Sequence, residues 1–417
     1  MAYGESSYPQ DADSTDPIGA AVGGDSGDAG ASDPSRQGVP RSVLDDVFDD
    51  PDHGEPGRDR MAIHFAWEAV LLVGAAVLAA LLLLRYPAAL RGDALDSVLV
   101  SGTALGLLTL AAGLTLRAGA VNLAIGPAAV ASALHFAENG DAGIAAVVVP
   151  AAVVAALLGL VLALVVVGLH VPGWAASLAA GLAVMVFIEQ RSAPVDVQGG
   201  YDPTRYAGYL FLGFAALAVL GGLFGSIKAV RRSVGRFRPV ADPAHRRGAV
   251  AAILTGGSIV LSAVLAVLAG VLLAAGGSGP VRPTTGIEWT GLALGAALLA
   301  GTSAFGRRGG VFGTLLAVAL LTLFVTYRDE RSWEVPLAAI AAASIVVGLV
   351  ATRLVESFGR PRSATADGDG WPGEPATPAR GGGRHGQQES WSSALPAQPT
   401  ESRLDLWGRD HWSDTDR

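Results

Sequence analysis

Apolar stretches of about 20 residues recur along most of this chain, and they constrain its fold more than any other sequence feature. A helix of that length crosses the hydrocarbon core of a bilayer and satisfies its own backbone hydrogen bonds there. The pattern therefore predicts an all-α polytopic membrane protein with about ten transmembrane helices, at residues 66–84, 97–116, 119–136, 142–169, 172–188, 208–227, 249–275, 287–305, 311–327 and 335–351.

Composition excludes several other classes of protein. Apolar residues make up 51% of the chain and charged residues 16%, whereas soluble domains carry roughly 25% charged residues. Because the chain contains no cysteine, it can form neither a disulfide scaffold nor a thiolate metal site, and it has no cysteine nucleophile.

Charge divides the chain into three regions. Residues 1–60 hold 14 Asp and Glu against 4 Lys and Arg, and they are rich in Ser, Gly and Pro. Such a segment buries too little apolar surface to offset its conformational entropy. We therefore predict a disordered acidic tail at 1–60, a transmembrane domain at 61–357 and a second disordered tail at 358–417. The net charge of −8 arises in the tails and gives no reason to expect nucleic acid as a partner.

The connections between the apolar stretches predict an orientation, because Lys and Arg accumulate on the cytoplasmic side of a membrane. Basic residues gather after the sixth, eighth and tenth stretches, whereas the connections after the third, fifth and ninth are mixed or acidic. We therefore expect a multi-pass protein of the plasma membrane with both termini in the cytoplasm. The basic residues are Lys228, Arg231, Arg232, Arg236, Arg238, Arg246, Arg247, Arg307, Arg308, Arg353, Arg360 and Arg362.

Two apolar stretches are interrupted by helix-breaking residues. The stretch at 116–136 contains Asn122 and the pair Gly126-Pro127, and the stretch at 170–190 contains Pro172-Gly173 followed by Trp174 and Ser177. Irregular backbone at membrane depth is tolerated inside protein or beside a water-filled cavity, so these residues are candidates for lining a polar path. Alternatively, Asn122 caps or bridges helices at a kink, and Trp174 anchors a helix end at the membrane interface.

Two further segments carry more than hydrophobicity. In 285–324, a helix rich in small residues ends in the glycine-rich GTSAFGRRGG, where Thr302 and Ser303 are polar groups that could be buried. In 233–253, Asp242 can cap a short helix that begins at Pro243 and ends at Gly248. This second segment either docks to a partner or only fixes the topology through its positive charge.

Taken in order, these segments resemble permease subunits of bacterial ABC importers of the monosaccharide and branched-chain amino acid type. GTSAFGRRGGVFGTLLAVALL resembles the family pattern Gly-Thr-Ser-x-x-Gly-Gly-x-Gly-x-x-x-Gly-Thr, with Arg307-Arg308 replacing part of the glycine run. AGAVNLAIGPAAVASA resembles Gly-Gly-Ile-Asp-Leu-Ser-Val-Gly, with Asn122 in place of Asp. VPGWAASLAAGLAVM resembles Pro-Pro-Phe-Ile-x-Thr-Leu-Gly, and ADPAHRRG resembles the cytoplasmic coupling segment Asn-Pro-x-Ala-Ala-x-x-x-Gly.

The resemblance covers about 97–355 and implies a set of roles and partners. Its substrate pathway would include Asn122, Gly126, Trp174, Ser177, Thr302 and Ser303. Its coupling segment would include Arg236, Asp242, Pro243, His245, Arg246, Arg247 and Gly248. The implied partners are ABC ATPase subunits, a second permease copy or paralogue, an extracytoplasmic solute-binding protein and the lipid bilayer.

The expected function is ATP-driven import of a small polar solute. A monosaccharide is the first choice, with a branched-chain amino acid or a nucleoside next. The chain has no G-x-x-x-x-G-K-[ST] phosphate loop, so it would bind no cofactor directly and ATP would be hydrolysed on partner subunits. An ion-coupled secondary transporter and a non-transporting membrane scaffold are alternatives. We expect no enzyme, because His64, His135, His170 and His245 are scattered across different apolar stretches and loops and form no recognisable catalytic or metal-binding motif.

Overall fold

The computed structural model of the chain describes residues 61–226, 249–303 and 311–359. All of these belong to one of the two units into which the chain divides, Met1–Pro361. The tail predicted at 1–60 lies outside the described residues, and so does the tail predicted at 358–417 apart from its first two residues. The predicted coupling residues from Arg236 to Gly248 also lie outside the described residues.

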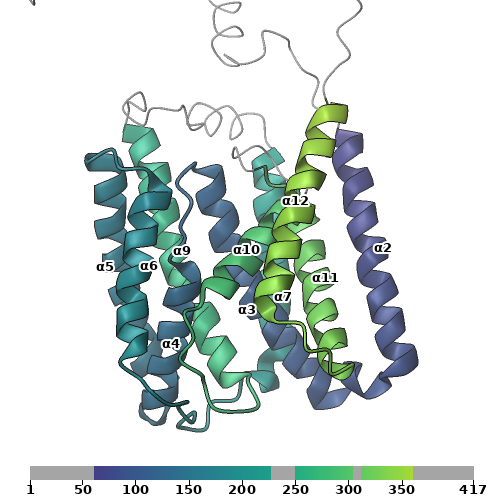
Figure 1. Cartoon of the computed structure of the whole chain (residues 1–417), viewed down its shortest axis with the longest axis horizontal. Coiled ribbons are helices and arrows are strands. Elements are labelled where there is room, and N and C mark those ends of the chain that lie inside the picture. Colours follow the sequence, from purple (N-terminus) through teal and green to yellow (C-terminus); the bar gives the residue numbers. More distant parts are fainter. Residues whose placement is uncertain (1–60, 227–248, 304–310, 360–417) are drawn as a thin grey trace, which may run out of the picture. The chain divides into compact units, whose positions relative to one another are not determined.

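The described residues form ten α-helices, one for each apolar stretch of the sequence (Figure 1). Within these ranges the only β pairing is an isolated bridge between Val195 and Val281, so the all-α prediction is confirmed there. The helices are α2 (Met61–Arg85), α3 (Gly92–Arg117), α4 (Ile125–Asn139), α5 (Ile144–Gly168), α6 (Gly173–Glu189), α7 (Ala207–Ser226), α9 (Ala249–Ala275), α10 (Ile287–Leu299), α11 (Gly313–Glu330) and α12 (Leu337–Gly359).

Six of these helices are long and apolar enough to cross a membrane, which indicates a membrane-spanning protein. The remaining four are shorter or more polar: α4 has 15 residues, α6 has 17, α10 has 13, and α11 has 18 but ends in three charged residues. Ten crossings, the choice of membrane and the cytoplasmic location of both termini therefore stay predictions. The six spans are Ile63–Arg85, Gly92–Arg117, Ile144–Gly168, Pro203–Gly225, Ala252–Ala275 and Leu337–Val355.

Two helix boundaries differ from the sequence prediction for a reason that matters to function. The third apolar stretch was expected to be helical from residue 119, but α4 begins at Ile125 because residues 118–124 leave the helical conformation. The eighth was expected to run to residue 305, but α10 ends at Leu299 before the glycine-rich segment. Both irregular segments have partners elsewhere in the bundle that an apolar pattern cannot reveal.

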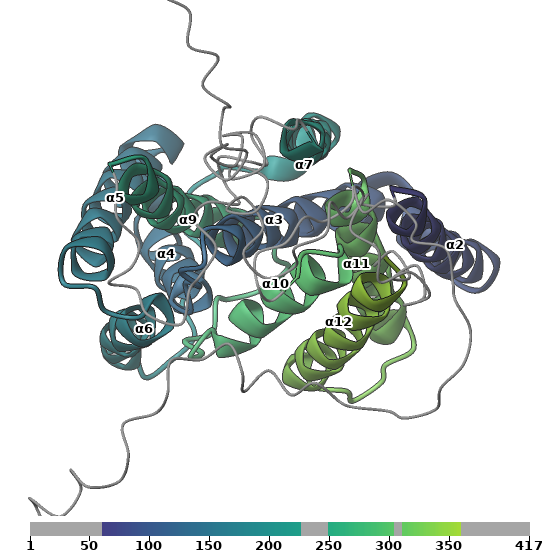
Figure 2. The same cartoon turned by 90° about the horizontal axis from the view of Figure 1, so that it is seen from above.

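Helix α3 lies at the centre of the bundle, with α9 and α10 packed against it (Figure 2). In its most apolar window 67% of the residues are buried, whereas the corresponding windows of α2, α5 and α7 are 22% buried. The peripheral helices direct leucine, valine and phenylalanine side chains outward. In a membrane-spanning protein these outward faces suit contact with lipid.

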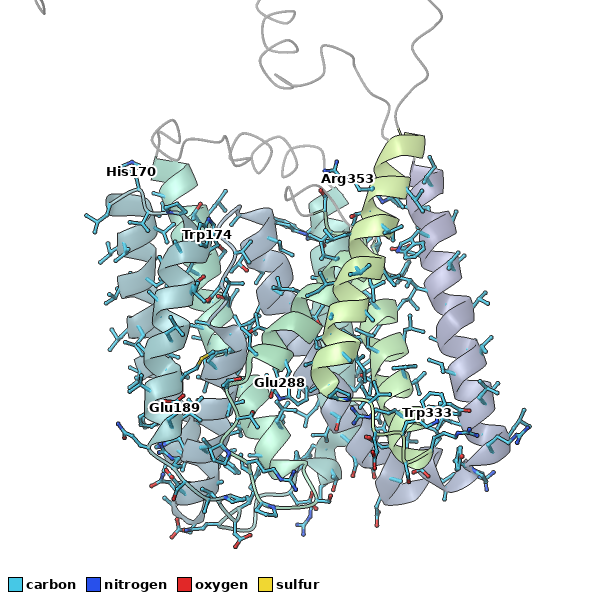
Figure 3. The ribbon with its side chains drawn as sticks, viewed as in Figure 1. His170, Trp174, Glu189, Glu288, Trp333 and Arg353 are labelled. Atoms are coloured by element: carbon cyan, nitrogen blue, oxygen red, sulfur yellow. The ribbon has the colours of Figure 1, made fainter. Side chains whose placement is uncertain are left out.

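Figure 3 places His170 and Arg353 toward one end of the bundle and Glu189 and Trp333 toward the other. At the Glu189 end, the carboxylate of Glu138 on α4 accepts two hydrogen bonds from the guanidinium of Arg191, of 2.6 and 2.8 Å. The guanidinium also lies 4.3 Å from the ring centroid of Phe187. This pair therefore ties the end of α4 to the end of α6.

We expect Glu138→Gln to lower stability at pH 7 by about 1 kcal/mol, because it removes a bidentate ion pair that is only partly exposed. The hydrogen bond from Arg191 lowers the pKa of Glu138 in the folded protein, although burial opposes this shift. A lowered folded-state pKa stabilises the fold above the unfolded-state pKa of about 4.3, and this stabilisation is lost as pH falls. Thermal unfolding of both proteins should therefore differ at pH 7 and converge in acid.

Asp141→Asn is the matched control, since Asp141 is an exposed carboxylate near Glu138 that makes no ion pair within the described ranges. A loss of stability for Glu138→Gln that stayed constant with pH would contradict this assignment.

Candidate functional site

The segment between α3 and α4, residues 118–124, is irregular backbone within the apolar bundle. Its second residue is Gly119, whose φ of +66° is a left-handed conformation that glycine adopts without strain. The position of Pro127 in the sequence suggests that this residue causes the break, but it does not. It lies in the first turn of α4, where a missing N–H costs no helical hydrogen bond.

Three hydroxyl side chains from different helices hydrogen-bond to the backbone of this segment. Thr115 Oγ1 of α3 accepts from Asn122 N at 3.4 Å, and Ser177 Oγ of α6 accepts from Leu123 N at 3.0 Å. Ser177 Oγ also donates to the carbonyl of Val121 at 2.9 Å. Each hydroxyl thus pairs backbone groups of the irregular segment inside the apolar bundle.

The third hydroxyl connects the segment to α10. Thr290 Oγ1 accepts from Gly126 N at 3.0 Å and donates to the carbonyl of Leu123 at 3.1 Å. Thr290 is 2% exposed, so water does not compete for these bonds. One side chain of α10 therefore fixes both the end of the irregular segment and the first turn of α4.

Asn122 is also bonded at both ends of its amide. Its Oδ1 accepts from Ala124 N at 3.0 Å, and its Nδ2 donates to Ser262 Oγ of α9 at 2.8 Å. The hydroxyl of Ser262 in turn donates to the carbonyl of Ile259 at 2.7 Å. Asn122 is 3% exposed, and its bond to Ser262 is an interhelical contact of the kind that the sequence allowed as an alternative to path lining.

The starts of α4 and α10 touch through glycine backbones. A Cβ atom on Gly126 would collide with the carbonyl of Gly286 and would lie 2.5 Å from Thr290 Oγ1. A Cβ on Gly286 would in turn lie 2.6 Å from the carbonyl oxygen of Gly126. We call this contact between Gly126, Gly286 and Thr290 the α4–α10 crossing.

The crossing joins two similar parts of the chain that run in opposite directions. In each part a long helix leads through a non-helical segment into a short helix: α3 into α4, and α9 into α10. Gly276 at the end of α9 packs against Val100 near the start of α3, while Ser262 reaches Asn122 beyond the end of α3, so α3 and α9 are antiparallel. Each short helix packs on the long helix of the other part.

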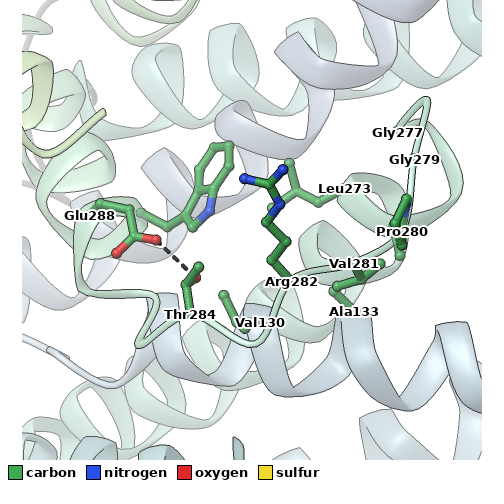
Figure 4. Close-up of a pocket in the computed structure, with 12 residues that line it drawn as sticks. Val130, Ala133, Leu273, Gly277, Gly279, Pro280, Val281, Arg282, Thr284 and Glu288 are labelled. Carbon is green, nitrogen blue, oxygen red and sulfur yellow. Dashed lines mark hydrogen bonds between the residues drawn. The ribbon is translucent and has the colours of Figure 1, made fainter. Parts of the chain in front are cut away.

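A pocket of about 340 Å³ adjoins the crossing (Figure 4). The segment that leads from α9 into α10 supplies its polar groups, and α4 and α9 supply an apolar wall. Thr284 Oγ1 donates to Glu288 Oε1 at 2.9 Å, and the side chain of Arg282 projects into the same space. The residues that line the pocket include Val130, Ala133, Leu273, Arg282, Thr284, Glu288 and Trp289.

The pocket contains both charges and an aromatic ring but no metal-binding cluster. Arg282 has no ion-pair partner in the described part of the chain, and Glu288 has Thr284 as its neighbour. Nowhere in residues 61–226, 249–303 and 311–359 do three His, Cys, Asp or Glu side chains gather as a metal site would require. The groups present can form charge-assisted hydrogen bonds to a small polar solute.

The structure brings together three of the six predicted pathway residues: Asn122, Gly126 and Ser177. The side chain of Trp174 is 58% exposed at the start of α6, whereas its backbone carbonyl accepts a hydrogen bond from Ser177 Oγ at 3.2 Å. Thr302 and Ser303 are 2% and 3% exposed, but they follow the far end of α10.

Sequence reasoning missed the partners of the irregular segment, Thr115, Ser262 and Thr290, as well as the pocket residues Arg282 and Glu288. For Thr115, Ser262 and Thr290, the sequence offered one indication of a role, a hydroxyl side chain within an apolar helix. Comparison with protein-family models, with curated proteins and with solved structures finds no match for this chain.

Proposed function

We propose that this chain is the membrane-spanning permease subunit of an ATP-driven ABC importer. The α4–α10 crossing is the observation that supports a transporter, and the sequence resemblance supports the ABC class. Paired, interrupted helices in two antiparallel parts of a chain are where membrane transporters place their solute sites, because the helix breaks free polar groups within the bilayer. Non-helical backbone so deeply embedded serves a plain membrane anchor no purpose, which disfavours the scaffold alternative.

A small polar solute, with a monosaccharide as first choice, is the cargo that we propose. The pocket beside the crossing offers a guanidinium, a carboxylate, a hydroxyl and the ring of Trp289 within a volume suited to a small ligand. Together with the sequence resemblance to sugar permeases, these groups support a solute rich in hydroxyl groups. Branched-chain amino acids and nucleosides come next.

Energy would come from ABC ATPase subunits that dock on the basic segment between α7 and α9, in a complex with a second permease copy or paralogue. A solute-binding protein would deliver the solute from the other side of the membrane. ATP binding can drive transport only if the ATPase interacts differently with the two conformations of the permease. The segment between α7 and α9 contains Arg246 and Arg247, which would be the coupling residues.

Charge reversal at these two positions tests the coupling. In proteoliposomes that contain the chain and its ATPase, Arg246→Glu/Arg247→Glu should reduce ATP-dependent uptake at least about tenfold, the loss expected when buried charge pairs at an interface are broken. Basal ATP hydrolysis should persist. The matched control, Arg360→Glu/Arg362→Glu, reverses two charges in another basic stretch and should retain uptake. Full uptake in the first variant would remove the docking assignment.

An ion-coupled secondary transporter is the second candidate, and one observation favours it. Glu68 lies within α2, is 5% exposed, and carries a carboxylate oxygen, Oε2, with no hydrogen-bond partner among the described residues. Ionisable residues inside membrane helices often mark ion pathways. Uptake into vesicles that is driven by an ion gradient without ATP would support this candidate over the ABC permease.

A further inference from the structure

Two consecutive residues of the peripheral helix α2 bind the ends of two other helices. Trp67 Nε1 donates to the carbonyl of Leu299, the last residue of α10, at 2.7 Å. Glu68 Oε1 accepts from the backbone N–H groups of Phe312 and Gly313 at the start of α11, at 2.7 and 2.9 Å. These three bonds link residues more than 200 positions apart in the sequence.

Both helix ends need such partners. The last carbonyls of a helix and its first N–H groups have no intrahelical partner, and a carboxylate is favoured at the positive, N-terminal end of the helix dipole. The residue before α11, Phe312, supplies no side-chain cap of its own. Trp67 therefore donates a hydrogen bond to a terminal carbonyl of α10, and Glu68 accepts hydrogen bonds from the first N–H groups of α11.

The end of α10 and the start of α11 pack so closely that a small displacement of one would change its contacts with the other. A Cβ on Gly313 would collide with the carbonyl of Ala300, and a Cβ on Gly222 of α7 would lie 2.8 Å from Val311 Cα. Along the chain, Thr302 and Ser303 follow Ala300 and precede Val311, and both are almost completely buried. The hydrogen bonds of α2 to Leu299, Phe312 and Gly313 thus flank two of the proposed pathway residues in the sequence.

The chemistry of Glu68 suggests more than packing. A carboxylate that is 95% removed from solvent within a membrane-spanning helix is costly, and its second oxygen has no hydrogen-bond partner in the described part of the protein. Apart from its contact with α11, helix α2 packs little against the bundle. Trp67 and Glu68 thus place polar groups on α2, although an entirely apolar helix would be enough to anchor the chain in a membrane.

We propose that Trp67 and Glu68 are positioning residues that hold the ends of α10 and α11 in register and thereby place Thr302 and Ser303. The transport consequence rests on the proposed function, whereas the positioning itself does not. If α2 moves relative to α10 and α11, these bonds must break, and we expect the segment that follows α10 to become more accessible.

Because the chain has no cysteine, a single Ser303→Cys variant gives a clean reporter of this segment. A water-soluble maleimide should label it slowly in the otherwise unchanged full-length protein, since Ser303 is 3% exposed. Adding Glu68→Ala should accelerate labelling at least about tenfold, since hydrogen bonds to a charged group are lost. Glu68→Gln keeps an oxygen that accepts from both N–H groups, so it should label within about threefold of the parent.

Ser132→Cys is the control reporter, because Ser132 is 6% exposed on α4, away from α2. Its labelling should be the same with Glu68 or Glu68→Ala. Unchanged labelling at position 303 in Glu68→Ala would overturn the proposal. Equal acceleration at positions 132 and 303 would also overturn it, because Glu68 would then support the whole fold rather than this segment.

Uptake separates this inference from the proposed function. If the parent protein transports, Glu68→Ala should lose most of its uptake and Glu68→Gln should retain most of it. If the parent transports no solute with ATP, the proposed function fails, while the labelling rates still decide whether Trp67 and Glu68 position the segment.

Discussion

Replacing Gly126 by alanine should destabilise the protein by about 3 kcal/mol or more and abolish uptake, although the change adds a single methyl group. The added carbon would collide with the carbonyl of Gly286 and lie 2.6 Å from the backbone nitrogen of Thr290. Backbone atoms cannot rotate away as a flexible side chain can. Helices α4 and α10 must therefore separate, which also breaks the hydrogen bonds of Thr290 to Gly126 and Leu123.

Thermal unfolding in detergent and the yield of monodisperse protein measure this effect. Gly213→Ala in α7 is the matched control, because a Cβ at Gly213 meets nothing within 4 Å and alanine favours a helix by about 1 kcal/mol over glycine. We expect Gly213→Ala to match or exceed the parent in stability. If Gly126→Ala unfolded at the parent's temperature, the close contact at the α4–α10 crossing would be wrong.

Replacing Asn122 by aspartate should cost about 3 kcal/mol, the price of placing an ionised carboxylate in a membrane interior. One carboxylate oxygen could still accept from Ala124 N, but the other would replace the Nδ2 group that donates to Ser262. The hydroxyl of Ser262 already donates to Ile259, so it could serve the carboxylate only by leaving that carbonyl unpaired. The change is nearly isosteric, so packing contributes little to the difference.

This variant also decides between the two roles that the sequence allowed for Asn122. Asn139→Asp, at an exposed position on α4, is the control and should change stability by less than about 1 kcal/mol. A capping and interhelical role predicts a large loss of stability for Asn122→Asp alone. If Asn122→Asp remained stable and instead changed which solute is taken up, Asn122 would line the pathway.

The sequence predicted helix existence well and functional contacts poorly, and particular residues show why. The interruption at Asn122 and Gly126 could be found because polar and helix-breaking residues stand out in an apolar stretch. The position of Pro127 suggests a helix break, yet the residue lies in the first turn of α4, since proline is equally suited to starting a helix. Thr290 gave no signal of its importance, because one threonine in a helix can simply bond to its own backbone.

The apolar stretches by themselves determined that the chain forms membrane-length helices and roughly where they lie. This is a local property, because a bilayer requires each segment to satisfy its own backbone within about 20 residues. Only the tertiary structure decided that Gly126 meets Thr290, 164 positions away, and that Trp67 and Glu68 serve the ends of α10 and α11. Helix packing within a bilayer depends on the shapes of the helix surfaces and on a few polar hydrogen bonds. Hydrophobicity does not select the packing partners, because lipid is as apolar as the helix faces themselves.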